Sequence, residues 1–195
     1  MAPPPEVVHW LFALGFLMLG LCLVCEVAVG PEVWRMHGWR PYLWPTFLFV
    51  MGMFMWAVMV FFTNSTVHMI AHGLWAQMMM IAGICLLGLA RGKLRSPLWT
   101  LSVALALLVG GGATLIHESQ GWLFNRSSFL HHLEGWGAIG AAVFPIGLSL
   151  RPRSRVFSLG LALLFFFLAI LLLCHRDIAP IFGHMSPDAR PLVPR

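Results

Sequence analysis

The sequence has 195 residues, of which 59% are hydrophobic and only 10% are charged. A typical soluble domain is about 45–50% apolar and about 25% charged, so this composition excludes most soluble globular folds and also a disordered chain. The formal net charge of +5 does not indicate a nucleic-acid partner, because most of the twelve Lys and Arg residues lie in short clusters between apolar runs. The composition therefore predicts an integral membrane protein.

Six apolar segments follow one another along the chain. Each has about 20 residues or more, which is enough to cross a hydrocarbon core of roughly 30 Å at about 1.5 Å per residue. We expect an all-α fold in which six transmembrane helices form one bundle over residues 1–177. A Pro-rich extramembrane tail follows over residues 178–195. The fifth segment contains Pro145 and is nevertheless predicted to be one helix. The predicted helices cover residues 7–29, 43–62, 67–90, 98–117, 128–150 and 156–175.

The Lys and Arg residues between the segments predict the orientation in the membrane. Eight of them lie in the first, third and fifth connections, and the opposite side has only Arg126 in its loops and three more around the tail. Cytoplasmic loops are enriched in Lys and Arg, so both termini are expected to be non-cytoplasmic. We expect a multi-pass protein of the cell membrane, with the bacterial inner membrane as the particular location. The basic loops are expected to be orientation anchors only, without a second site at their end.

Histidine shows the opposite distribution, since eight of the nine histidines fall on the predicted outer side and only His37 lies in a cytoplasmic connection. Interfacial histidines are also tolerated without any function, because one edge of the ring reaches water. As a group, however, they predict a metal or heme site, since neutral imidazole is a common ligand of Zn, Cu and Fe. The candidate metal ligands are His68, His72, His117, His131, His132 and His175, with Glu118 and Glu134 as carboxylates that would orient a ligating imidazole.

The spacing of these residues refines the expected site. Residues four apart share one face of a helix, so the side chains of His68 and His72 are expected to point toward one common partner. We expect this pair and at least one of His117, His131 and His132 to converge within ligand distance of a common point.

Three further features of the sequence bear on the predicted function. Gln77 is expected to be a buried polar group, about one turn deeper than His72. The small residues between 135 and 142 favour either a close helix contact or room for a flat cofactor. The chain has no hydrolase triad, phosphate loop or zinc-protease motif, so no enzymatic activity is assigned.

The segment V-H-M-I-A-H-G-L at residues 67–74, followed by outer-side histidines on later helices, resembles bacterial copper-handling membrane proteins. The families most similar in pattern are the CopD-type copper-resistance proteins and the CtaG-type cytochrome oxidase assembly factors. The chain also resembles the transmembrane protein 45 family, in which histidines end one helix and open the next. These resemblances cover the third to fifth predicted helices. They imply a copper-related membrane protein whose ligands are among His68, His72, His117, His131 and His132.

Three functions are compatible with these patterns. The first is binding of a transition metal, with copper preferred, at the outer face for metal handling, assembly or delivery. The second is a b-type heme or quinone-linked electron-transfer subunit, with two of the outer histidines as axial ligands. The third is a non-catalytic accessory subunit of a larger membrane complex. The expected partners are the lipid bilayer and either such a complex or a metal-delivering protein.

Overall fold

A computed structural model describes residues 5–62, 66–117 and 126–174, and these residues form helices joined by turns. Six spans within them are long and apolar enough to cross a membrane, which confirms the predicted all-helical fold and supports a multi-pass membrane protein. His175 and the predicted tail lie outside the described residues. The helices are α1 (Pro5–Val29), α2 (Pro31–Met36), η1 (Arg40–Tyr42), α3 (Leu43–Phe62), α4 (Thr66–Ala90), η2 (Pro97–Thr100), α5 (Leu101–His117), α6 (Arg126–Ala141), α7 (Val143–Leu150) and α8 (Arg155–Leu173).

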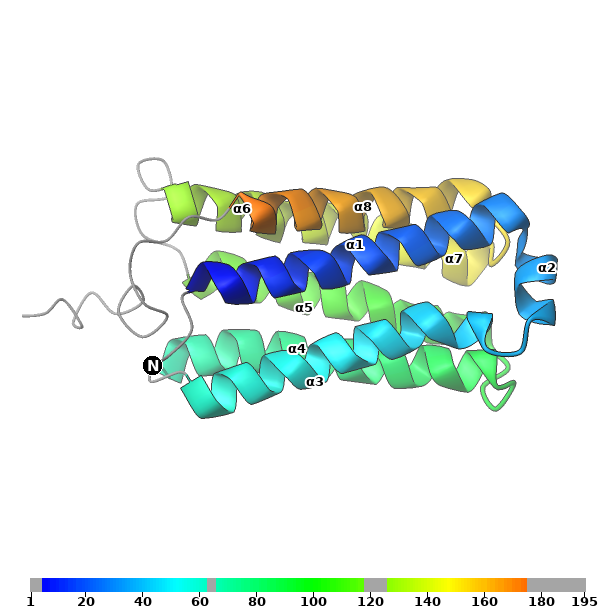
Figure 1. The fold of residues 1–195 in the computed structure, drawn as a ribbon, viewed down its shortest axis with the longest axis horizontal. Helices are drawn as coiled ribbons and strands as arrows, with labels where there is room; N and C mark the ends of the chain where they lie inside the picture. The colour runs from blue at the N-terminus through cyan, green and yellow to red at the C-terminus, as the bar shows by residue number, and fades with distance from the viewer. Residues whose placement is uncertain (1–4, 63–65, 118–125, 175–195) are drawn as a thin grey trace, which may run out of the picture.

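The long helices form a bundle in which successive spans run in opposite directions (Figure 1). Helix α1 packs against α3 and α8, and the series of contacts continues from α3 to α4, α5, α6 and back to α8. The bundle is thus a closed ring of neighbours. The start of α1 and the end of α8 lie at the same end of it (Figure 1). We call this the histidine end, because α1, α4 and α6 begin there with His9, with His68 and His72, and with His131 and His132.

The opposite end, which we call the basic end, carries α2, η1 and η2 (Figure 1). Gly30 has a φ of +92°, which glycine adopts readily, and it allows the sharp turn from α1 into α2. The guanidinium of Arg40 lies 5.6 Å from the ring centroid of the buried Trp34. Glu32 and Arg153 form an ion pair at 2.9 Å between two exposed side chains. These contacts connect the short segments of the basic end.

The fifth predicted helix, over residues 128–150, corresponds to one apolar span from Phe129 to Leu150, and the structure divides this span into α6 and α7 at Ala142. Helix α6 ends at Ala141, and α7 begins at Val143. Pro145 explains this interruption, because it has no N–H to donate to the carbonyl of Ala141 and its ring crowds that carbonyl. Ala142 keeps helical backbone angles, and its N–H donates to the carbonyl of Ile139 at 3.2 Å. The pair still forms one apolar span from Phe129 to Leu150.

Aromatic rings from three helices fill the bundle interior below the histidine end. Phe16 of α1 stacks on Trp75 of α4 with ring centroids 6.2 Å apart, and on Phe165 of α8 at 5.9 Å. Both distances lie in the range of about 4.5–7 Å typical of favourable aromatic pairs. Phe16 and Phe165 are buried. We call these three rings the aromatic plug.

Helices α5 and α6 approach each other through glycine. A Cβ atom at Gly111 would lie 2.6 Å from the carbonyl oxygen of Gly135, and a Cβ at Gly135 would lie 2.9 Å from the carbonyl oxygen of Gly111. A Cβ at Gly137 would lie 2.7 Å from the ring of Phe167 on α8. Of the two expectations for the small residues of this helix, the structure therefore supports close helix contact at these positions.

Candidate functional site

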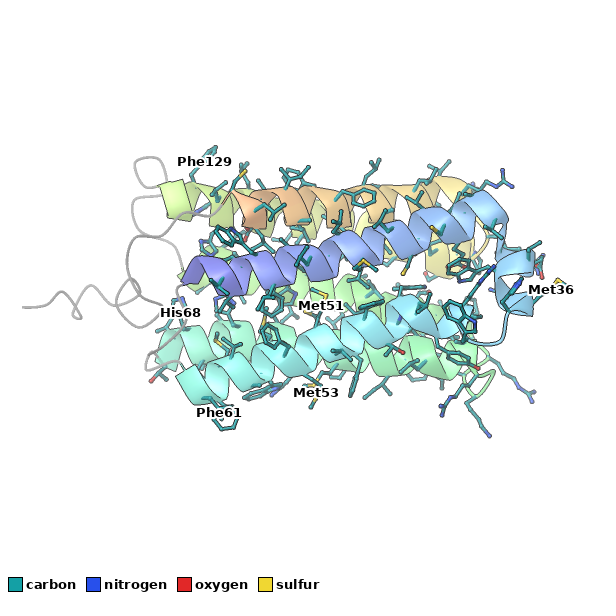
Figure 2. All side chains as sticks on the ribbon, viewed as in Figure 1. Met36, Met51, Met53, Phe61, His68 and Phe129 are labelled. Carbon is teal, nitrogen blue, oxygen red and sulfur yellow. The ribbon has the colours of Figure 1, made fainter. Side chains whose placement is uncertain are left out.

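The described histidines of the histidine end belong to the first turns of three helices. His9 lies in α1, His68 and His72 in α4, and His131 and His132 in α6. His68 lies at this end of the bundle (Figure 2). All three helices begin at the same end, so their first turns occupy one layer of the molecule. This layer lies within the apolar spans, where an ionisable side chain is costly and usually marks a functional position.

His68 and His72 form one imidazole pair on α4. Their ring centroids are 5.3 Å apart and the ring planes are inclined by 38°. His68 is only 5% exposed, and His72 is half-buried. The sequence predicted this shared helix face from the spacing of four residues, and the ring distance confirms it.

His9 and His131 form a second imidazole pair, which connects α1 with α6. Their ring centroids are 6.0 Å apart, with the planes inclined by 70°. His131 is 2% exposed. His9 is half-buried and was not among the predicted ligands. The signal that could have identified His9 was its depth, since it lies in the first turns of a span, as His68 and His131 do.

Glu134 follows His131 by three residues, so the two side chains share a face of α6. Glu134 is 6% exposed, and both side chains therefore point into the protein. A buried carboxylate one helix turn from a buried imidazole has the position expected of a group that orients a ligating histidine. This role of Glu134 stays a prediction, and Glu118 lies outside the described residues.

The six predicted metal ligands are not all brought together by the described residues. His68 and His72 are paired with each other, His131 is paired with His9, and His132 is half-buried beside His131. His117 is the last residue of α5, but its side chain, like all of His175, lies outside the described part of the chain. Within that part, no group of three or more His, Cys, Asp or Glu side chains could hold one metal ion. Convergence of three ligands on one point therefore stays a prediction.

Two polar side chains near this layer do not contribute to it. Gln77 is exposed on the outside of the bundle, so the expectation that it is a buried polar group was wrong. Its register on α4 explains this, because Gln77 lies on the same helix face as the exposed Leu74 and Ile81. Thr114 of α5 is buried, and its hydroxyl donates to the carbonyl of Gly110 at 2.8 Å. Its polar group is thus satisfied within its own helix.

The basic end also contains a possible site, contrary to the expectation that its loops are only orientation anchors. A cavity of about 660 Å³ lies there, and Glu26, Arg35 and Arg95 contribute to its walls. These residues are far apart in the sequence, so their convergence depends on the packing of the helices.

Comparison with protein-family models, with curated proteins and with solved structures finds no match to this chain. The resemblance to copper-handling membrane proteins accordingly stays a prediction.

Proposed function

We propose that this protein is a multi-pass membrane protein that binds a transition-metal ion, with copper preferred, through imidazoles at its histidine end. Its role would be metal handling or delivery at the outer face of the cell membrane. The observation that carries the proposal is the pairing of imidazoles from α1, α4 and α6 in one buried layer, His68 with His72 and His9 with His131.

The ring distances support metal binding by either pair. A metal–imidazole nitrogen bond is about 2.0–2.1 Å long, so two imidazoles on one ion have ring centroids roughly 5–6.5 Å apart. The observed separations of 5.3 Å and 6.0 Å fall within that range. Each pair supplies two ligands, and the proposal requires further ligands from water or from residues outside the described ranges.

The interior of the bundle favours binding or delivery over translocation. An ion that crossed the bundle from the histidine end would have to pass the aromatic plug, where Phe16 is stacked between Trp75 and Phe165. Aromatic side chains offer no oxygen or nitrogen ligands along such a path, apart from the single indole N–H of Trp75, which only donates. The ion is therefore expected to enter and leave at the same end.

Metal analysis of purified variants tests the proposal. The double variant His68→Ala/His72→Ala should lose at least half of the copper that the wild type retains after purification or takes up as Cu(I). The matched control is His37→Ala, because His37 is an exposed histidine at the basic end, where its ring bonds to the carbonyl of Val33 at 3.2 Å. This control should bind as much copper as the wild type.

The same sample distinguishes the two alternatives. A Soret band in its visible spectrum would contradict the copper proposal and favour a b-type heme subunit. Neither metal nor heme, together with stable co-purification of other membrane proteins, would favour an accessory subunit. Equal copper content in the wild type and the double histidine variant would contradict a role for His68 and His72.

A further inference from the structure

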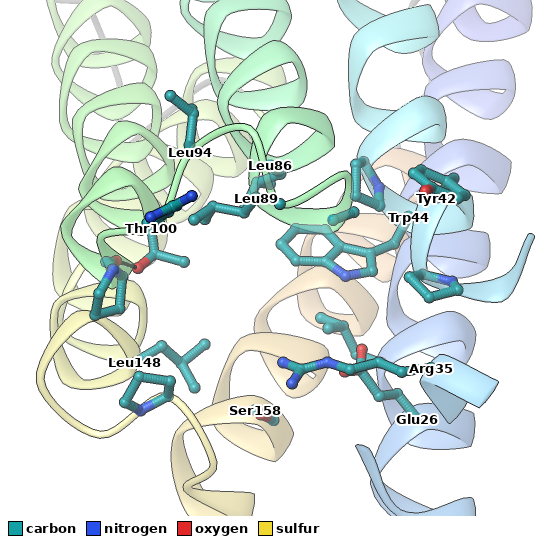
Figure 3. Close-up of a pocket in the computed structure, with 18 of the residues that line it drawn as sticks. Glu26, Arg35, Tyr42, Trp44, Leu86, Leu89, Leu94, Thr100, Leu148 and Ser158 are labelled. Atoms are coloured by element: carbon teal, nitrogen blue, oxygen red, sulfur yellow. Dashed lines mark hydrogen bonds between the residues drawn. The ribbon is translucent and has the colours of Figure 1, made fainter. Parts of the chain in front are cut away.

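The basic end contains a cavity of about 660 Å³ that is separate from the histidine layer (Figure 3). Its walls come from the ends of α1, α3, α4, α7 and α8 at this side of the bundle, from the short segments α2, η1 and η2, and from the connections between them. These wall segments lie at the ends of the apolar spans, which finish at Val29 and Ala90 and begin at Arg40 and Pro97. The cavity is therefore at the depth where a spanning bundle meets phospholipid headgroups. Its volume is within the usual range of about 300–1,000 Å³ for ligand sites.

Most of the wall is apolar. Figure 3 shows Leu86, Leu89 and Leu94 together on one side of the open space, and Trp44 beside them. Leu148 contributes from α7. Water that fills such a space lacks polar partners, so an apolar group that replaced it would gain the free energy of burial. This part of the wall fits an aliphatic chain.

The remaining wall carries charge of both signs, with an excess of positive charge. Figure 3 shows Arg35 beside Glu26, with its guanidinium directed into the open space. Arg95 lines the cavity from the connection between α4 and η2. The lining residues thus include two guanidinium groups and one carboxyl group. Guanidinium binds phosphate and carboxylate oxygens through paired N–H donors.

We infer that this cavity binds an amphiphile with an anionic phosphate headgroup, held by Arg35 and Arg95, whose apolar chain lies along Leu86, Leu89 and Leu94. The cavity is larger than a phosphate group, and a fully soluble anion would make no favourable contact with its apolar wall. Basic pockets between helices near a membrane surface are typical sites for anionic lipid headgroups. This inference does not depend on metal binding at the histidine end.

Native mass spectrometry of the purified, delipidated full chain tests the inference with three probes. These are dioctanoyl phosphatidic acid, dioctanoyl phosphatidylcholine and inorganic phosphate. The phosphatidic acid should bind one molecule per chain and more tightly than the phosphatidylcholine, which has the same chains but carries no net charge. Inorganic phosphate should not displace it at similar concentrations, because it cannot use the apolar wall.

Matched charge variants separate the cavity from general attraction to a basic surface. Arg35→Gln/Arg95→Gln should weaken phosphatidic acid binding by about tenfold or more, because two charge-assisted contacts are lost. Arg91→Gln/Lys93→Gln removes the same charge from exposed positions at the same end that do not line the cavity, and should bind like the wild type. Glu26→Gln should tighten binding by about threefold or more, since it removes the one negative charge that faces the headgroup.

A filling variant tests the space itself. Ser158→Trp places a large ring where the half-buried Ser158 lines the cavity, and should abolish binding without removing charge. Equal weakening by the two double variants would overturn the inference, because binding would then follow surface charge. Displacement by inorganic phosphate would overturn the assignment of an amphiphile and indicate a soluble phosphate ligand. Unchanged binding in Ser158→Trp would overturn the location.

Discussion

At the scale of single residues, the histidine end is defined by imidazoles that are removed from water. His68 and His131 are 5% and 2% exposed, and each lies in ring contact with another histidine. Burial of a polar ring in an apolar bundle costs free energy unless the ring finds polar partners. Pairing two rings in contact also places like charges side by side whenever both are protonated. The free-energy cost of burial and the repulsion between the rings are both smaller when the two imidazoles are neutral and bind one metal ion.

Acid should therefore release the bound metal. Imidazole binds a metal ion in its neutral form, so protons compete with the ion as pH falls. Lowering the pH from about 7.5 to about 5 should weaken copper retention by about tenfold or more, because two or more protons replace each ion. Retention is measured by dialysis against a weak chelator, followed by metal analysis. His37→Ala should follow the wild-type profile. A pH-independent retention would contradict histidine ligation.

At the scale of helices, the contact between α5 and α6 depends on the absence of a side chain at Gly111. Gly111→Ala would place a methyl group 2.6 Å from the backbone oxygen of Gly135, which cannot move without shifting α6. Overpacking of this kind typically costs about 1–3 kcal/mol. The free energy of unfolding, measured by denaturant titration in mixed micelles, should fall by about that amount.

The neighbouring glycine supplies a matched control for this variant. A Cβ at Gly112 meets nothing within 4 Å, so Gly112→Ala should leave stability unchanged or raise it by up to about 1 kcal/mol through helix propensity. Equal destabilisation by the two variants would contradict the close contact between α5 and α6.

The positions of the long helices were predicted well from the sequence, whereas the interruption in the fifth span and the short helix α2 were not predicted. Residues 43–62 were predicted as a helix and form α3, because an apolar run of that length has few alternatives in a membrane. The interruption at Ala142 was not predicted although Pro145 was recognised, since proline inside a spanning helix is often tolerated and its local effect depends on the packing. Helix α2 was missed because a segment of six residues that includes charged side chains is too short to show the hydrophobic periodicity of a helix.

The candidate sites were predicted where nearby residues in the sequence define them, and they were missed where they depend on contacts between distant residues. The pairing of His68 with His72 follows from a spacing of four residues, and it was predicted. The contact of His9 with His131 joins residues more than a hundred positions apart, and no local pattern indicates it. Arg95 was interpreted only as an orientation signal, because its presence in one cavity with Arg35 depends on how α2 folds back and on where α4 ends.

At the scale of the whole molecule, the basic residues and the buried histidines lie at opposite ends of one bundle. The positive-inside rule then predicts that the histidine end faces away from the cytoplasm. Cysteine labelling tests this orientation. In a background with Cys22, Cys25, Cys85 and Cys174 replaced by Ala, a membrane-impermeant thiol reagent should label Thr66→Cys in intact cells.

The comparison position for labelling is Lys93→Cys at the basic end. Thr66 is the first residue of α4, Lys93 follows its last residue by three, and both side chains are exposed, so their intrinsic reactivity should be similar. Lys93→Cys should be labelled only after the membrane is permeabilised. The reverse pattern would contradict the predicted orientation and would place the proposed metal site on the cytoplasmic side.

X-ray absorption spectroscopy of the copper-loaded protein tests histidine ligation at the histidine end. Imidazole ligands should give a nearest shell of nitrogen at about 2.0 Å, together with the outer-shell scattering of imidazole rings. The nitrogen shell should be lost in His68→Ala/His72→Ala and retained in His37→Ala. A nearest shell of sulfur at about 2.3 Å would contradict histidine ligation, because the ligands would then be Cys or Met side chains.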